Sequence, residues 1–107
     1  MKEKAKDSYF ITAYDAANDD TLYLELLRPN IKGIVEAVFT PLVCAGKRFD
    51  SLADAQAFCK ILVSNYVKNF KLDRTLLPDD IKNTLEVAMC ITDCRKYTRP
   101  FPIWSIN

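Results

Sequence analysis

One segment of this sequence constrains the fold more than any other, and it begins at Ser51. A serine is well suited to cap the N-terminus of a helix, and Asp54, three residues later, completes a variant of the capping box. The apolar residues that follow recur at steps of three and four: Leu52, Ala55, Cys59, Leu62 and Tyr66, with Phe58, Val63 and Val67 beside them. Because polar residues occupy the other side, the pattern predicts an amphipathic helix whose apolar face covers a sheet.

Three segments before this helix have the composition of β-strands. Residues 8–14 are rich in aromatic and β-branched side chains and lead into a polar turn. Residues 22–27 are apolar and stop at Pro29, which lacks the N–H group that a strand ladder uses. Residues 34–39 resume the strand composition until Pro41 interrupts it. We therefore expect an antiparallel hairpin followed by a third strand with an irregular end.

The segments after the helix are shorter. Residues 76–81 indicate a loop that enters a helical turn, because Pro78 suits a first helical position and acidic residues favour a helix N-terminus. Residues 84–92 fit both a helix and an alternating strand, and we favour a strand because the segment is short and rich in β-branched residues. Two prolines in residues 97–104 exclude an ordinary central strand there.

These elements predict an α+β fold, in which a small antiparallel sheet of three to four strands is covered by one main amphipathic helix, with a short second helical turn. A chain of 107 residues has room for one hydrophobic core. We expect residues 1–107 to form a single domain, with 1–7 as a flexible arm and 98–107 as a tail rich in proline and aromatic residues.

The hairpin and the segment AGKRFDSLADAQAF, from Ala45 to Phe58, resemble small accessory proteins of bacteriophages and mobile elements. In that group a strand passes through a similar segment directly into a helix, and a further strand follows. The resemblance covers roughly the first two thirds of the chain, and it implies a compact ββα-type fold and a phage origin. It implies no chemistry.

The residues that most catalytic mechanisms require are missing. The chain contains no histidine, which removes the commonest general base near neutral pH, the commonest partner of a catalytic nucleophile and the commonest metal ligand. Its two glycines cannot supply a phosphate-binding loop or a dinucleotide fingerprint. We therefore expect no enzymatic activity and no cofactor.

The acidic pairs and the cysteines also favour structural roles. The pairs Asp19–Asp20 and Asp79–Asp80 could contribute to a cation site, but aspartate favours turns and helix N-termini for local reasons, and a fuller ligand set is absent. The spacing of the cysteines matches neither a redox motif nor a zinc motif, so we expect buried free thiols: Cys44, Cys59, Cys90 and Cys94.

Charge and hydropathy restrict the possible cellular location of the chain and its possible partners. A formal net charge of +1 gives little of the long-range field that attracts nucleic acid, so we expect nucleic-acid binding only as an alternative. No apolar run approaches the roughly 20 residues that span a bilayer, and the first residues lack the apolar stretch of a signal peptide. We expect a cytoplasmic protein that binds no membrane.

Aromatic residues make up 11% of the chain, which is more than so small a core can enclose. Some of them should therefore lie at a surface, where Tyr, Trp and Arg are the residues that most often dominate protein contacts. The residues that we expect to bind a partner are at the C-terminal end: Arg95, Lys96, Tyr97, Arg99, Phe101, Ile103 and Trp104. The alternative is a tail that packs across the sheet of its own molecule.

These observations favour a non-enzymatic protein-interaction module, such as a phage-encoded inhibitor or adaptor of a host defence complex, of which an anti-CRISPR protein would be one instance. We also expect a homodimer with Phe101, Ile103 and Trp104 at or near the contact, because an uncovered sheet edge is commonly paired with a copy of itself. An oligomer that binds a nucleotide-like signal through Arg48, Arg95 or Arg99 is the alternative. An enzyme would need an unfamiliar carboxylate or thiolate mechanism, with Cys90 and Cys94 as candidates.

Overall fold

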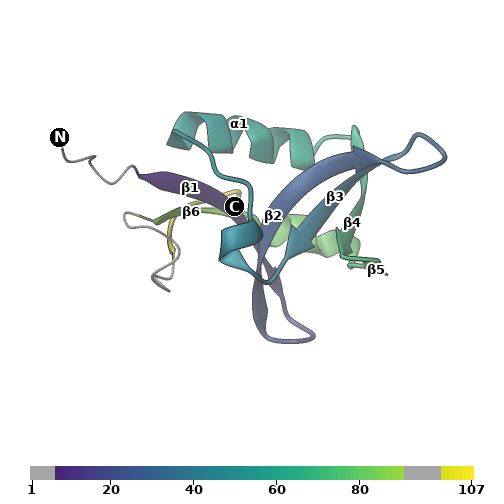
Figure 1. Ribbon diagram of the computed structural model, residues 1–107, viewed down its shortest axis with the longest axis horizontal. Coiled ribbons are helices and arrows are strands. Elements are labelled where there is room, and N and C mark those ends of the chain that lie inside the picture. Colours follow the sequence, from purple (N-terminus) through teal and green to yellow (C-terminus); the bar gives the residue numbers. More distant parts are fainter. Residues whose placement is uncertain (1–6, 91–99) are drawn as a thin grey trace.

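The structure, a computed structural model, describes residues 7–90 and 100–107 and is built around one sheet (Figure 1). Its strands are β1 (Ser8–Asp15), β2 (Asp20–Pro29), β3 (Val35–Thr40), β4 (Val67–Leu72), β5 (Thr75–Leu76), β6 (Glu86–Cys90) and β7 (Phe101–Ser105). The helix α1 spans Leu52–Leu62, and two 3₁₀ turns, η1 and η2, span Val43–Ala45 and Asp79–Thr84.

The sheet differs from the predicted one. It has seven strands in the order β5-β4-β3-β2-β1-β6-β7. The strands β3 and β4 are parallel, and every other neighbouring pair is antiparallel. The expectation of a small antiparallel sheet of three to four strands was therefore wrong, and the fold is an extended mixed sheet with one main helix.

The missed strands have two physical causes. The apolar stripe of the helix was read as far as Val67, but α1 ends at Leu62, and Val67 is the first residue of β4. The hydroxyl of Ser64 donates a hydrogen bond to the carbonyl of Ile61 and accepts one from the N–H of Tyr66, so a local turn replaces the helix. The prolines of the tail were compatible with a strand because β7 lies at the sheet edge, where a missing N–H interrupts no ladder.

The local predictions succeeded where the signal was short-range. The side chain of Ser51 accepts a hydrogen bond of 3.1 Å from the N–H of Asp54 and caps α1 as expected. The strands expected around residues 8–14 and 84–92 are present as β1 and β6, whose described part ends at Cys90. The helical turn expected after Pro78 is η2.

The main core lies between the sheet and α1, and η2 contributes to it. From α1, Ala55, Cys59 and Leu62 are fully buried. They share one apolar cluster with residues of five strands and of η2 and its flanks: Ile11, Ala13, Leu22, Leu24, Ala37, Phe39, Val67, Phe70, Val87, Leu77, Ile81 and Leu85. Figure 1 shows α1 lying along one face of the sheet. We call the opposite face of the sheet the second face.

The second face is covered in part by η1, and the loop that follows η1 fills a gap within the sheet. The strands β1 and β2 separate beyond the Thr12–Tyr23 pair, and residues 47–49 fill the gap, with Phe49 exchanging two backbone hydrogen bonds with Tyr9. The chain reaches this gap through η1, which packs on a small cluster of Phe10, Tyr23 and Cys90. A methyl group at Gly46 would lie 3.1 Å from Cβ of Tyr23, so the loop approaches the sheet closely.

Candidate functional site

Strand β7 forms one edge of the sheet and carries the described part of the predicted partner surface. It pairs with β6 only, through Met89↔Phe101 and Val87↔Trp104, with a register shift between these pairs. Of its two aromatic residues, Trp104 is half-buried and Phe101 is exposed, although both pair with residues on one face of β6. The strand therefore combines an anchored side with an open edge.

The predicted partner residues fall into three groups. Phe101 and Ile103 are exposed, with 44% and 38% of their surface accessible. Trp104 is half-buried and packs against the main core, so it anchors the strand to its own molecule. The other four predicted residues, Arg95, Lys96, Tyr97 and Arg99, lie outside the described residues, as do Cys94 and residues 1–6 of the predicted arm. The structure thus brings Phe101 and Ile103 together on one exposed strand.

Pro102 lies between these two exposed side chains. A proline in a strand has no N–H group and is tolerated at an edge, where it removes one donor from the open side. An added strand would therefore find an interrupted ladder on β7. Contacts at this edge must depend mainly on the apolar side chains of Phe101 and Ile103.

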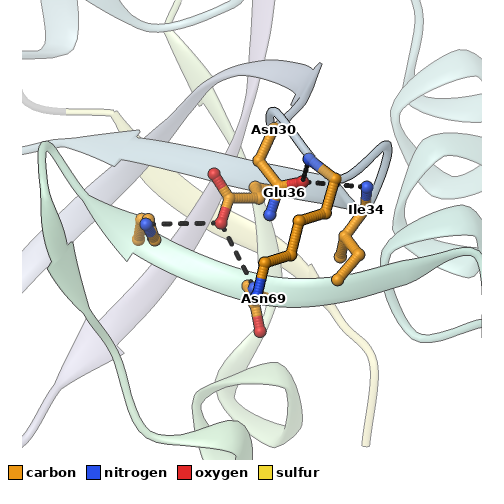
Figure 2. A network of polar contacts seen from close by, with 6 residues as sticks. Asn30, Ile34, Glu36 and Asn69 are labelled. Atoms are coloured by element: carbon orange, nitrogen blue, oxygen red, sulfur yellow. Dashed lines mark hydrogen bonds and ion pairs between the residues drawn. The ribbon is translucent and has the colours of Figure 1, made fainter.

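A buried carboxylate on the second face was missed from the sequence. Glu36 of β3 is 3% exposed, and its Oε2 accepts a hydrogen bond of 3.2 Å from the side-chain amide of Asn69 and lies 3.3 Å from Nζ of Lys71. Figure 2 shows Glu36 and Asn69 pointing toward each other from neighbouring strands. Nearby, the side chain of Asn30 accepts hydrogen bonds from the N–H groups of Lys32 and Ile34 and closes the β2–β3 turn.

The surroundings of Glu36 stabilise its ionised form. Burial alone would raise the pKa of this carboxyl group, but the hydrogen bonds from Asn69 and Lys71 and the charges of Lys71 and Arg28 outweigh it, so the pKa is lowered from 4.5. A carboxylate with a lowered pKa stays ionised and is a poor general base near neutral pH. The network therefore joins β3 to β4.

The remaining candidate groups are placed as follows. Cys59 is fully buried, which raises the pKa of its thiol to about 12 and leaves it unreactive. Cys90 is also buried, but the expectation of a buried thiol was wrong for Cys44, which is exposed in η1. The pair Asp19–Asp20 lies at the β1–β2 turn, and Asp79–Asp80 begins η2. Within residues 7–90 and 100–107, no group of three or more cysteine, aspartate or glutamate residues could hold a metal ion.

The comparisons with known proteins found no relative. No family model matches the chain, and no curated protein and no solved structure is similar to it at the thresholds applied. In the described part of the chain, no helix is long and apolar enough to cross a membrane.

Proposed function

We propose that the chain is a cytoplasmic, non-enzymatic protein-interaction module that uses β7 as its contact strand. One observation carries the proposal: the edge strand of the sheet exposes Phe101 and Ile103 side by side with Pro102, while Trp104 holds the same strand on the core. Rigid, exposed apolar side chains on an anchored strand are typical of protein contacts, because little conformational entropy is lost when they are buried.

Two kinds of protein partner fit this contact strand, a second copy of the chain and a host protein. A host defence complex, the partner class suggested by the resemblance to phage accessory proteins, is the first to test. In either case, the partner would bury Phe101 and Ile103, which favours side-chain packing over strand addition because Pro102 interrupts the ladder.

Site-specific photo-crosslinking tests the proposal. A photoreactive phenylalanine derivative is placed at Phe101, and in a control variant at Leu76, which is 62% exposed on β5 at the other edge of the sheet. After irradiation in bacterial extract, we expect a discrete adduct from position 101 and none from position 76. The adduct mass distinguishes a second copy of the chain from a foreign protein.

The captured partner must then bind the purified chain in a way that depends on β7. The double variant F101S/I103S should weaken this binding by more than about tenfold, since two apolar contacts of about 1 kcal/mol each are removed. Equal adducts from positions 101 and 76, or unchanged binding by the double variant, would refute β7 as the contact strand.

A further inference from the structure

One end of the molecule combines exposed apolar side chains with an excess of positive charge. It is formed by the hairpin between β2 and β3 and by the connection between α1 and β4. The two segments lie side by side, because β3 and β4 are parallel and Val35 at the start of β3 pairs with Val67 at the start of β4. Figure 1 shows the hairpin projecting past the end of α1. We call residues 28–34 and 60–68 together the basic end.

The charges of the basic end have one sign. It contains no aspartate or glutamate and four exposed basic residues: Arg28, Lys32, Lys60 and Lys68. The charge of Arg28 helps to lower the pKa of the buried Glu36. The three lysines form no ion pair with any described residue. Because the whole chain has a formal net charge of only +1, its positive charge is concentrated at this end.

Exposed apolar side chains are also concentrated at the basic end. In the part of the chain that the structure describes, ten large apolar side chains are exposed, and four of them belong to this end: Ile31, Ile61, Val63 and Tyr66. Ile31, at the hairpin tip, is fully exposed, so it buries no surface that would stabilise its own fold. Tight turns favour Gly, Asn, Asp, Ser and Pro. Neither the core nor the turn therefore explains an isoleucine at the tip.

The hydrogen bonds of Asn30 hold the hairpin tip in one conformation (Figure 2). Its side-chain oxygen accepts hydrogen bonds of 2.8 and 3.0 Å from the N–H groups of Lys32 and Ile34. Its N–H donates a hydrogen bond of 2.8 Å to the carbonyl of Ile34, and its carbonyl accepts one of 2.9 Å from the N–H of Gly33. The turn at Ser64 orders the α1–β4 connection in a similar way. Ordering these segments therefore costs little conformational entropy when a partner binds.

The apolar side chains and the ordered turns favour a protein over other anionic partners. Aliphatic side chains such as Ile31 and Val63 neither stack on bases nor form hydrogen bonds with them, and only Tyr66 could stack on a base. A fluid lipid surface does not require a pre-ordered turn, whereas packing against a shaped protein surface benefits from one. Lysines around apolar side chains are complementary to carboxylates around apolar side chains.

We propose that the basic end is a second protein-contact surface, and that it binds an acidic segment of a partner in which carboxylates are interspersed with apolar residues. Ile31 and Tyr66 pack against the apolar residues of that segment, and Lys32 and Lys68 pair with its carboxylates. The basic end belongs to the inner strands β2, β3 and β4, whereas β7 forms a sheet edge. This contact therefore goes beyond the proposed function and does not depend on it.

Selection from a displayed library of random short peptides tests the proposal, with the full chain as the target. The probe is the most enriched peptide, synthesised with a fluorophore, and fluorescence anisotropy measures its affinity. We expect it to be rich in Asp and Glu, with apolar residues among them, and to shift the amide signals of Ile31, Tyr66 and Lys68. The double variants I31S/Y66S and K32E/K68E should each weaken its binding by more than about tenfold.

The control variants are L42S and K82E, which change an exposed apolar side chain beside η1 and an exposed charge of η2. Both should bind the peptide like the wild type. The β7 variant F101S/I103S should also bind it normally, so this contact and the proposed function can fail separately. All the altered side chains of the basic end are exposed, and the amide spectrum of each variant shows directly whether it is folded.

Three results would overturn the acidic segment as the occupant: no enriched peptide, an enriched peptide without an excess of carboxylates, or wild-type binding by either double variant. Parallel titrations with oligothymidylate and with phosphatidylglycerol vesicles test other anionic partners. If either one bound more than about tenfold tighter than the peptide, and K32E/K68E abolished that binding, the basic end would be a nucleic-acid or lipid contact instead.

Discussion

Strand β5, at one edge of the sheet, has two residues, whereas β7, at the other edge, has five. Both edges are protected against strand addition, β5 by its shortness and β7 by Pro102. They differ in what holds them: Trp104 anchors β7 to the apolar core, whereas the strand next to β5 is joined to β3 by the charged network of Glu36. The comparison indicates that β7 is an apolar edge, whereas the β5 end adds a charged network to the apolar contacts of Val67, Phe70 and Leu77.

The largest effect should come from removing the anchor of β7. The substitution W104A should lower the free energy of unfolding by about 2–3 kcal/mol, less than for a fully buried tryptophan because Trp104 is half-buried. On the opposite edge, L76A should change it by less than about 0.5 kcal/mol, since Leu76 is largely exposed. Urea unfolding followed by far-ultraviolet circular dichroism measures both, because W104A removes the only tryptophan.

The conservative variant W104F keeps an aromatic ring against the core and should recover more than half of the loss. If W104A and L76A were equally destabilising, the two edges would be anchored alike and the comparison would not hold.

An acid titration should affect the β5 end through Glu36. The pKa of this group is lowered in the folded chain, so its contribution to stability is present above 4.5 and is lost as the pH falls through the folded value. The variant E36Q should therefore be less stable than the wild type at neutral pH, and the difference should shrink below pH 4.5. Urea unfolding at a series of pH values measures this difference.

The control for E36Q is E25Q, a change of a half-buried carboxylate on β2 that forms no ion pair with the described residues. Because E25Q leaves the Glu36 network intact, it should still lose the contribution of Glu36 as the pH falls. A constant difference between E36Q and the wild type across the acid range would contradict the assigned role of Glu36.

A smaller effect on stability is expected from Pro102. The substitution P102T restores one backbone N–H at the open edge of β7 and should change the free energy of unfolding by less than about 1 kcal/mol. It should nevertheless increase self-association, because the interrupted ladder is completed. Light scattering at several concentrations measures this, with P100T, just outside β7, as the control. Equal scattering by both variants would show that Pro102 does not protect the edge.

The sequence predicted the elements whose signals are local. Ser51 and Asp54 mark the start of α1 within four residues, and the alternation in residues 8–14 predicts β1. The number and order of strands depend on pairings between distant segments. The connection between the parallel strands β3 and β4 contains the whole of α1, and β7 pairs with β6 although residues 91–100 lie between them in the sequence. Such pairings leave little trace in composition, which explains the underestimated sheet.

The candidate sites also combine features that the local sequence predicts with features that depend on pairings between distant segments. The exposure of Phe101 and Ile103 agrees with an excess of aromatic and apolar residues in the tail, but the inward turn of Trp104 depends on its pairing with Val87. A glutamate within the apolar run of β3 was a visible signal for a buried charge. Its partner Asn69, however, lies 33 residues further along. Only the register of the sheet brings such groups together.

Sedimentation equilibrium on the full chain tests most directly whether the chain associates with a second copy of itself through β7, and not through β5. We compare the wild type with F101S/I103S on β7 and with L76S on β5. The account predicts a dimeric wild type, a dimeric L76S and a monomeric F101S/I103S that retains the wild-type circular dichroism spectrum. A monomeric wild type, or a double variant that remains dimeric, would contradict self-association through β7.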